Sequence, residues 1–334
     1  FNETAVSAIK QNIISRYSGN YNPSKQGLIF ERKVHSSRSQ KYVAINTGDI
    51  LAEMVNQGLD FEWQVLKMVY RNVKIDGIKQ RVLDSTTPHL VACFLKTKDD
   101  SLNGLGKIAF YIINSADGST KLRGVFGWLN GACLNGCVFS ECSLIDVKQR
   151  HIGEKAKKLV SEDIAKFVTQ IKTSIESNLL GMLNNIKLMT QTTMDRETYR
   201  EFAKEAFELR MTYSGVSINK ELGDRIENVD YDAIGLNSAA REEFDDGSVW
   251  SEVQKAQENL KGNFQFENKR KHLPKVSFTV VNHVEKDGKM VAKGKKQSLR
   301  NSDNIDNKVE FNQELFKLAI KYQRICAEKR AKLA

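Results

Sequence analysis

The stretch KIAFYIINSADGSTKLRGVFGWL, residues 107–129, decides the fold of this chain. An apolar run ends at Asn114, the pair Asp117-Gly118 follows, and residues 121–129 return as a second strand-like run. Asp-Gly between two such runs is among the strongest sequence signals for a tight β-hairpin. The stretch therefore predicts two antiparallel strands at the centre of a sheet, and its glycines allow a close backbone approach where the sheet passes into a helix.

Further strands are expected before this hairpin, and helices after it. Alternating apolar and polar residues, with many β-branched and aromatic side chains, predict strands at residues 61–74 and 89–98, with a turn at Asp76-Gly77. Later the apolar spacing changes to three and four residues, which predicts amphipathic helices at 155–191, 195–210, 247–260 and 309–329. This order favours an α+β fold, in which an antiparallel sheet of three or more strands is followed by long helices in a β-β-β-α-type core.

Three segments are predicted along the chain. Residues 1–46 form an N-terminal helix and a polar arm, residues 47–265 form the α+β core domain, and residues 266–334 form a basic segment and a C-terminal helix that packs on the core. Within the core, a helix is expected from Thr47, whose hydroxyl can cap the first turn. Gly58 can end this helix, because glycine readily takes the left-handed conformation of a helix C-terminus.

The charge balance favours an anionic partner. The chain has 334 residues, with 51 Lys and Arg against 41 Asp and Glu, a formal charge of +10 and a pI near 9.2. Such a chain attracts polyanions at long range, although a soluble protein without a polyanionic partner can also be basic. No apolar run approaches the roughly 18 residues of a membrane helix, so no membrane association is expected. Five cysteines, an odd count without a recognisable signal peptide, favour free thiols and a cytoplasmic location.

No enzyme motif is recognisable. The glycines at positions 124, 127, 131 and 136 match neither the phosphate-binding pattern GxxxxGK[ST] nor the dinucleotide pattern GxGxxG. The acidic residues form no recognisable catalytic pair, and the zinc-protease pattern HExxH is absent. We therefore expect no catalytic residue, no cofactor and no enzymatic activity.

The cysteine-rich passage after the hairpin leaves two interpretations open. Cys133, Cys137, Cys142 and His151 are four residues of the types that bind zinc. Their spacing is looser than that of paired CxxC ligands, so small buried thiols between a strand and a helix are the favoured interpretation. Zinc binding is the alternative, and no metal is assigned.

Basic side chains gather beside the hairpin and late in the chain. Residues 267–300 contain ten basic and three acidic residues, a local charge of +7. Lysine and arginine bind phosphates by charge, and aromatic rings among them can stack on unpaired bases, while a solvated charged face is the alternative. The candidate nucleic-acid-binding residues are Lys121, Arg123, Lys148, Arg150, Lys269, Arg270, Lys271, Lys293, Lys295, Lys296 and Arg300. Phe126 and Trp128 are candidates either for base stacking or for the core.

Four short motifs, in this order, resemble those of the phage- and plasmid-like proteins grouped as domain of unknown function 932. They are NSADGS at 114–119, ACLNG at 132–136, RHIG at 150–153 and GSVW at 247–250. The resemblance spans about residues 40–325. Ala116 stands where the family motif has histidine, and Gly136-Cys137 stands where it has Thr-Leu, so a role that needs that histidine is not expected here.

The resemblance implies a phage- or plasmid-encoded protein. A β-β-β-α core is also similar to that of single-strand-annealing recombinases such as the phage lambda Beta protein, which bind single-stranded DNA in a basic groove, form rings or filaments and need no ATP. We therefore expect a homo-oligomer that binds and anneals single-stranded DNA in recombination, in the cytoplasm of a bacterial host. The alternative is a viral interaction protein without nucleic-acid activity, either a virion component or an inhibitor of host defence.

Overall fold

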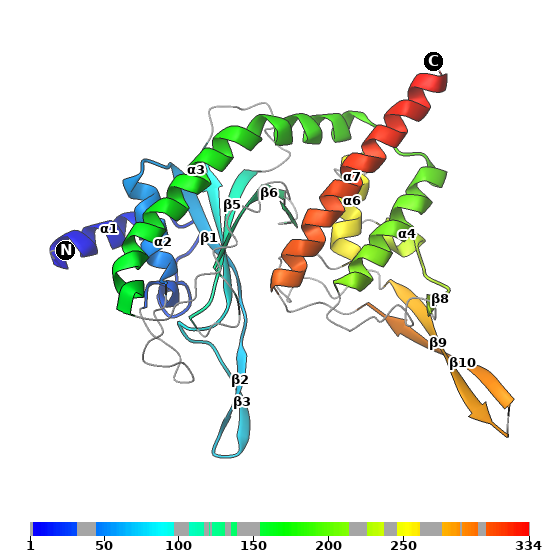
Figure 1. Ribbon diagram of the computed structural model, residues 1–334, viewed down its shortest axis with the longest axis horizontal. Helices are drawn as coiled ribbons and strands as arrows, with labels where there is room; N and C mark the ends of the chain where they lie inside the picture. The colour runs from blue at the N-terminus through cyan, green and yellow to red at the C-terminus, as the bar shows by residue number, and fades with distance from the viewer. Residues whose placement is uncertain are drawn as a thin grey trace. The chain divides into compact units, whose positions relative to one another are not determined.

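The computed structural model divides the chain into two compact units (Figure 1). Unit one comprises Phe1–Leu129 and Glu141–Leu179, and unit two comprises Asn130–Ser140 and Leu180–Ala334. The predicted core segment, residues 47–265, contributes to both units. The structure describes residues 3–31, 45–96, 107–116, 120, 122–130, 135–138, 154–213, 226–236, 246–260, 276–287, 289–299 and 305–333.

Unit one is built on an antiparallel sheet. Four of its strands, β1 (Phe61–Met68), β4 (His89–Leu95), β5 (Lys107–Asn114) and β6 (Arg123–Asn130), lie side by side in that order. Strands β5 and β6 pair from Lys107 opposite Leu129 to Ile113 opposite Arg123, which confirms the predicted hairpin. From position 108 onward β5 is buried at every residue, so the centre of the sheet is covered on both faces.

Helices pack against one face of this sheet. They are α1 (Glu3–Ser15), the short 3-10 helix η1 (Gln26–Phe30), α2 (Thr47–Asn56) and the first part of α3 (Glu154–Gln191). The indole Nε1 of Trp63, on β1, donates a hydrogen bond of 2.6 Å to the carbonyl oxygen of Ile13 at the end of α1. This contact fixes the N-terminal helix to the edge strand of the sheet.

The close approach of α3 to the sheet depends on Gly124. A Cβ atom at this position would lie 2.4 Å from Phe110 and 2.9 Å from Phe167, and Phe167 belongs to α3. The two phenyl rings meet edge to face, with their centroids 6.4 Å apart. The absence of a side chain at residue 124 therefore lets the aromatic ring of the helix reach the sheet.

A two-stranded hairpin extends from unit one, away from its other described elements (Figure 1). Its strands are β2 (Arg71–Ile75) and β3 (Ile78–Val82), and they pair with each other alone. The turn residues Asp76 and Gly77 have φ values of 50° and 80°. Positive φ at both central positions is typical of a type I′ hairpin turn, as the Asp-Gly pair predicts.

Unit two is mainly helical. It contains α4 (Arg196–Thr212), α6 (Val249–Asn259) and α7 (Ile305–Leu333), and α7 packs against both of the others. Every residue of α6 is buried, including its polar residues, so this helix lies at the centre of the unit. The unit also includes the short strand β7 (Asn135–Val138) and the 3-10 helix η3 (Asp232–Ile234).

A small sheet completes unit two. Its order is β10 (Lys289–Ser298), β9 (Ser277–Lys286) and β8 (Ile226–Glu227), all antiparallel. At its base, the ring of Phe278 packs edge to face on Phe207 of α4, with a centroid separation of 5.7 Å. Beyond this contact β9 and β10 continue as a two-stranded hairpin that projects from the unit (Figure 1).

The α+β class predicted from the sequence is confirmed, with an antiparallel meander followed by the long helix α3. The last helix is longer than predicted, since α7 begins at Ile305 and ends at Leu333. Within the part of the chain that the structure describes, no helix is both long enough and apolar enough to cross a membrane.

Candidate functional site

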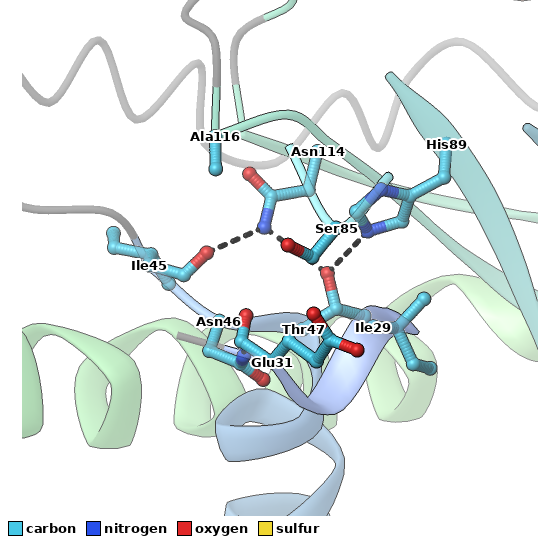
Figure 2. A pocket seen from close by; sticks show the side chains of 9 residues that line it. All are labelled: Ile29, Glu31, Ile45, Asn46, Thr47, Ser85, His89, Asn114 and Ala116. Atoms are coloured by element: carbon cyan, nitrogen blue, oxygen red, sulfur yellow. Dashed lines mark hydrogen bonds between the residues drawn. The ribbon is translucent and has the colours of Figure 1, made fainter. Parts of the chain in front are cut away.

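Polar side chains from α2, β4 and β5 meet in the interior of unit one (Figure 2). The hydroxyl oxygen of Thr47 lies 2.7 Å from Nε2 of His89 and 3.0 Å from Nδ2 of Asn114. The Asn114 amide also donates to the carbonyl oxygen of Ile45 at 2.8 Å, and Nδ1 of His89 lies 2.9 Å from the carbonyl oxygen of Thr87. We call Thr47, His89 and Asn114 the polar network.

The contacts assign the protons of the polar network. A carbonyl oxygen only accepts hydrogen bonds, so Nδ1 of His89 carries the proton that faces Thr87. The other ring nitrogen then accepts from the Thr47 hydroxyl, and the Thr47 oxygen accepts from the Asn114 amide. With every group engaged and His89 only 4% exposed, the imidazole has no free nitrogen to act as a base on a substrate.

A small cavity adjoins the polar network. Its volume is about 10 Å³, close to the smallest space that holds one water molecule, and its lining includes Glu31, Ser85 and Ala116. The buried hydroxyl of Ser85 has no hydrogen-bond partner among the described residues, so a single water is the occupant that fits. The cavity is too small for a substrate, and the polar network is therefore a structural link between α2, β4 and β5.

The predicted cap of α2 is wrong by one residue. The side-chain oxygen of Asn46 accepts a hydrogen bond of 2.7 Å from the backbone N–H of Gly48, and its amide donates to the carbonyl oxygen of Glu31. Asn46 therefore caps the helix, because its backbone is extended and its side chain reaches the first turn, while the Thr47 hydroxyl points into the polar network. Gly58 has a φ of 77°, the left-handed conformation expected after this helix.

Two of the sequence motifs have structural roles. Asn114 belongs to the polar network, and the hydroxyl of Ser115 exchanges hydrogen bonds with the backbone N–H and carbonyl of Thr120 across the turn of the central hairpin. In the later motif, Ser248 caps α6 through the N–H of Ser251, and Trp250 is buried. The contacts of these residues are therefore structural.

An open hollow of about 450 Å³ lies on unit two over α4. Arg200 and Lys204 line it together with Glu201, Asp230 and Asp232. Its lining thus carries both signs of charge, and it contains no cluster of metal ligands among the described side chains.

Four of the predicted nucleic-acid-binding residues lie within the described residues. Arg123 is half-buried at the start of β6 in unit one, while Lys293, Lys295 and Lys296 are exposed on β10 in unit two. The others, Lys121, Lys148, Arg150, Lys269, Arg270, Lys271 and Arg300, lie outside the described residues.

The proposed stacking residues are in the core. Phe126 is 0% exposed and Trp128 is 2% exposed. Their partners on β5 are Phe110 and Ile108, so both rings lie on the sheet face that packs against α3. Neither ring offers a face to a nucleic-acid base, and of the two interpretations left open by the sequence, the core is the one that this structure supports.

The described residues leave the zinc interpretation untested. Cys133, Cys142 and His151 lie outside them, and Cys137 is described only as a backbone position of β7. Cys93 and Cys326 are free and buried. Burial raises the pKa of the Cys93 thiol well above its usual range, so this cysteine is an inert core residue.

The lysines of the β9–β10 hairpin lie on two faces. Lys293 pairs with Asn282 and Lys295 pairs with Val280, whereas Lys296 pairs with Thr279. Successive side chains of a strand point to opposite faces, so Lys293 and Lys295 share one face with Lys286 and Lys289, and Lys296 points to the other. We call Lys286, Lys289, Lys293 and Lys295 the lysine row.

The lysine row is exposed and contains no acid. All four lysines are exposed, and the other described side chains of the same face are Phe278, Val280, Asn282, Val291 and Gln297. Asp287 lies in the turn of this hairpin. No described acidic side chain forms an ion pair with the row, so its charges face solvent.

Sequence reasoning missed a second basic hairpin, β2–β3. Lys74, Lys79 and Arg81 are exposed on it, with Asp76 as its one acid. The missed signal was in the printed sequence, because RNVKIDGIKQR places basic residues on both sides of an Asp-Gly turn, with Lys79 and Arg81 two positions apart. Even spacing puts side chains on one face of a strand.

Comparison with known proteins identifies a family. The family profile described as "Domain of unknown function (DUF932)" matches residues 34–315. No curated protein and no solved structure matches the chain.

Proposed function

Because the chain belongs to the domain of unknown function (DUF932) family, whose description states no activity, we propose a function from its surface chemistry: ATP-independent binding and annealing of single-stranded DNA. The proposal includes a phage or plasmid origin, a homo-oligomeric ring or filament, and the cytoplasm of a bacterial host as the place of action. These last parts rest on the sequence resemblance and on the basic composition.

The observation that carries the proposal is the lysine row. Four exposed cations lie on one face of a projecting hairpin, and no acid lies among them. A surface of this kind attracts the phosphate backbone without reading base sequence, because each neutralised phosphate releases counterions. Annealing needs this chemistry, since two anionic strands must approach each other while their bases stay free to pair.

The first test is the binding of a fluorescein-labelled oligonucleotide of about 30 nucleotides, measured by fluorescence anisotropy in about 50 to 200 mM NaCl. The expected result is submicromolar affinity at the lowest salt, with a steep loss of affinity as salt rises. An absence of binding at the lowest salt overturns the proposal. Annealing is measured with two complementary strands that carry a fluorophore and a quencher.

A matched pair of variants locates the binding surface. Lys293→Gln with Lys295→Gln removes two charges from the lysine row, and we expect weaker binding and a smaller salt dependence. Lys166→Gln with Lys172→Gln removes two exposed charges from α3 and serves as the control. Equal losses in the two variants would indicate a general charge effect instead of a binding surface.

One observation favours the alternative, a viral interaction protein. Met290 and Val291 are 66% and 46% exposed near the tip of the β9–β10 hairpin, and β10 is an edge strand. An edge strand that exposes apolar side chains is also a site where another protein chain can pair. Light scattering with and without oligonucleotide separates the two functions, since annealing predicts a large assembly that grows with DNA, and inhibition predicts a small particle that ignores DNA.

A further inference from the structure

The β2–β3 hairpin presents a single cationic face. Asn72 pairs with Arg81, and Lys74 pairs with Lys79. Paired residues share a face, as do residues two apart, so these four side chains project from the same side of the ribbon. Lys74, Lys79 and Arg81 are exposed, and no described acid forms an ion pair with any of them. The face is therefore a short row of three unneutralised cations.

An exposed aromatic ring lies at the base of this row. Tyr70 precedes β2 and is 46% exposed. The guanidinium carbon of Arg81 lies 5.2 Å from the centroid of the Tyr70 ring, a cation–π contact. This contact holds the ring in place while leaving much of it open to solvent. Tyrosine rings and arginine planes are the surfaces on which proteins stack unpaired bases.

The β2–β3 hairpin contains a pair of like charges that lowers its own stability. Lys74 stands directly opposite Lys79, one pair from the turn, and like charges in that position repel. The β9–β10 hairpin repeats the arrangement, with Lys286 directly opposite Lys289 beside its own Asp-Gly turn. A bound polyanion relieves this repulsion, so both hairpins are better suited to an anionic partner than to water alone.

We propose that the β2–β3 hairpin is a second contact for single-stranded DNA, in which Lys74, Lys79 and Arg81 bind phosphates and Tyr70 stacks on an unpaired base. The inference rests on the proposed function and extends it, because the lysine row of β9–β10 has only charge, whereas the β2–β3 face combines charge with an exposed ring. Stacking needs an unpaired base, so this contact distinguishes single strands from duplexes.

The test uses the full-length protein and the labelled single-stranded oligonucleotide. For Lys74→Gln with Lys79→Gln we expect the slope of log affinity against log salt to fall by about 1.4, at roughly 0.7 for each phosphate contact on a single strand. For Tyr70→Leu we expect a Kd about 5- to 100-fold higher, with the slope unchanged, because a stacked base is lost and no charge is removed. The control is again Lys166→Gln with Lys172→Gln, for which we expect no comparable fall of the salt slope.

A stability measurement separates weaker binding from a loss of folded protein. The lysine variant removes a repulsion, so its unfolding midpoint in urea is expected to equal or exceed that of the wild type while its binding weakens. A second readout uses the wild-type protein and an iodouracil-containing strand. Ultraviolet crosslinking is expected to label the tryptic peptide of residues 68–71, which contains Tyr70.

The outcomes separate the inference from the proposed function. If the wild type binds DNA, the lysine-row variant weakens binding and the β2–β3 variants do not, the inference is wrong and the proposed function stands. If the wild type does not bind single strands, both are wrong. If an unlabelled duplex competes as well as a single strand, or Tyr70→Leu binds normally and the peptide is not crosslinked, the stacking role is overturned.

Discussion

The hydroxyl of Thr47 lies 2.7 Å from Nε2 of His89, and this hydrogen bond joins the first turn of α2 to the first residue of β4. Thr47 also accepts from Asn114, the last residue of β5, so one hydroxyl connects three elements in the interior of unit one. The same hydrogen bonds that align these elements occupy the imidazole, which is why a buried histidine beside a hydroxyl here supports the fold and not a reaction.

We therefore predict that Thr47→Val destabilises the protein by about 1 to 3 kcal/mol, because the buried amide of Asn114 and Nε2 of His89 each lose a partner. Urea unfolding followed by tryptophan fluorescence measures the change. Thr212→Val is the control, since Thr212 is exposed and bonds only within its own helix. Equal stability of Thr47→Val and the wild type would show that the polar network is not structural.

A second prediction concerns the contact between α3 and the sheet. Gly124→Ala places a methyl group 2.4 Å from Phe110 and 2.9 Å from Phe167, two buried rings with little room to move. Overpacking of this kind costs about 1 to 3 kcal/mol. The measurement is the midpoint of thermal unfolding, which is expected to fall.

The control for this variant is the same substitution in an open place. Gly181 lies within α3, and a Cβ atom there would meet no other atom within 4 Å. Gly181→Ala is expected to stabilise the helix by up to about 1 kcal/mol, because alanine has the higher helix propensity. Destabilisation by both substitutions would contradict the packing argument.

A third prediction concerns the buried ion pair of α6. Nζ of Lys255 lies 2.6 Å from Oε1 of Glu252, and the two side chains are only 6% and 11% exposed. Lys255→Met alone leaves a buried carboxylate without this partner, so we expect a loss of about 3 to 5 kcal/mol. The double variant Glu252→Leu with Lys255→Met is expected to recover most of the loss, as measured in a double-mutant cycle by urea unfolding.

An exposed pair at the same helical spacing is the comparison. Lys317 and Glu314 lie 2.7 Å apart on α7, with side chains 52% and 35% exposed. Lys317→Met should change stability by less than about 1 kcal/mol, because solvent screens an exposed pair. If Lys255→Met and Lys317→Met lost similar stability, burial would not be the reason for the strength of the Glu252–Lys255 pair.

A fourth prediction concerns pH. The backbone N–H of Thr198 donates to Asp195, the cap of α4, and this bond, with further help from the Thr198 hydroxyl and Lys329, lowers the pKa of the Asp195 carboxyl. A carboxyl whose pKa is lower in the folded state stabilises the protein above the pKa of the unfolded chain, and the contribution is lost as pH falls through the folded value. Asp195→Ala is thus expected to cost about 1 kcal/mol near neutral pH. The gap should narrow in acid below about pH 4, because the protonated carboxyl still accepts from the helix but loses the contribution of its charge.

The comparison variant here is Asp195→Asn. Asparagine keeps a side-chain oxygen that can accept from the N–H of Thr198 but carries no charge, so most of the capping contribution should remain without its pH dependence. Urea unfolding at neutral and acidic pH checks both variants. A constant difference between wild type and Asp195→Ala over the whole range would rule out the charged cap.

A fifth prediction follows from the register of β9 and β10. Lys293 belongs to the lysine row, whereas Lys296 points to the opposite face. Lys293→Gln and Lys296→Gln each remove one positive charge, three positions apart on the same strand. If the lysine row contacts DNA, Lys293→Gln should lose more DNA affinity than Lys296→Gln. Anisotropy at low salt measures the two losses, and an equal effect would mean that binding does not depend on the face.

Much of the fold could be predicted from the sequence because its signals are local. Asp-Gly pairs mark the β2–β3, β5–β6 and β9–β10 hairpins, and the change of apolar spacing marks the start of α3. Local signals were less exact for the cap of α2, where neighbouring Asn46 and Thr47 are both suitable residues and only their surroundings decide between them. The candidate site was predicted in part, since Lys293 and Lys295 of the lysine row were identified, whereas Lys286, Lys289 and the basic residues of β2–β3 were not.

The sequence by itself determined the α+β class, the order of strands and helices, and the excess of positive charge, because propensity, periodicity and composition are properties of the chain alone. Only the tertiary structure decided that Phe126 and Trp128 are buried, and that Lys286 of β9 shares a face with Lys289, Lys293 and Lys295 of β10. Burial and facing depend on which strands pair and in which register, and these are set by contacts between residues far apart in the chain. The same dependence brings Arg81 over Tyr70, a pairing eleven positions apart that the hairpin makes a direct contact.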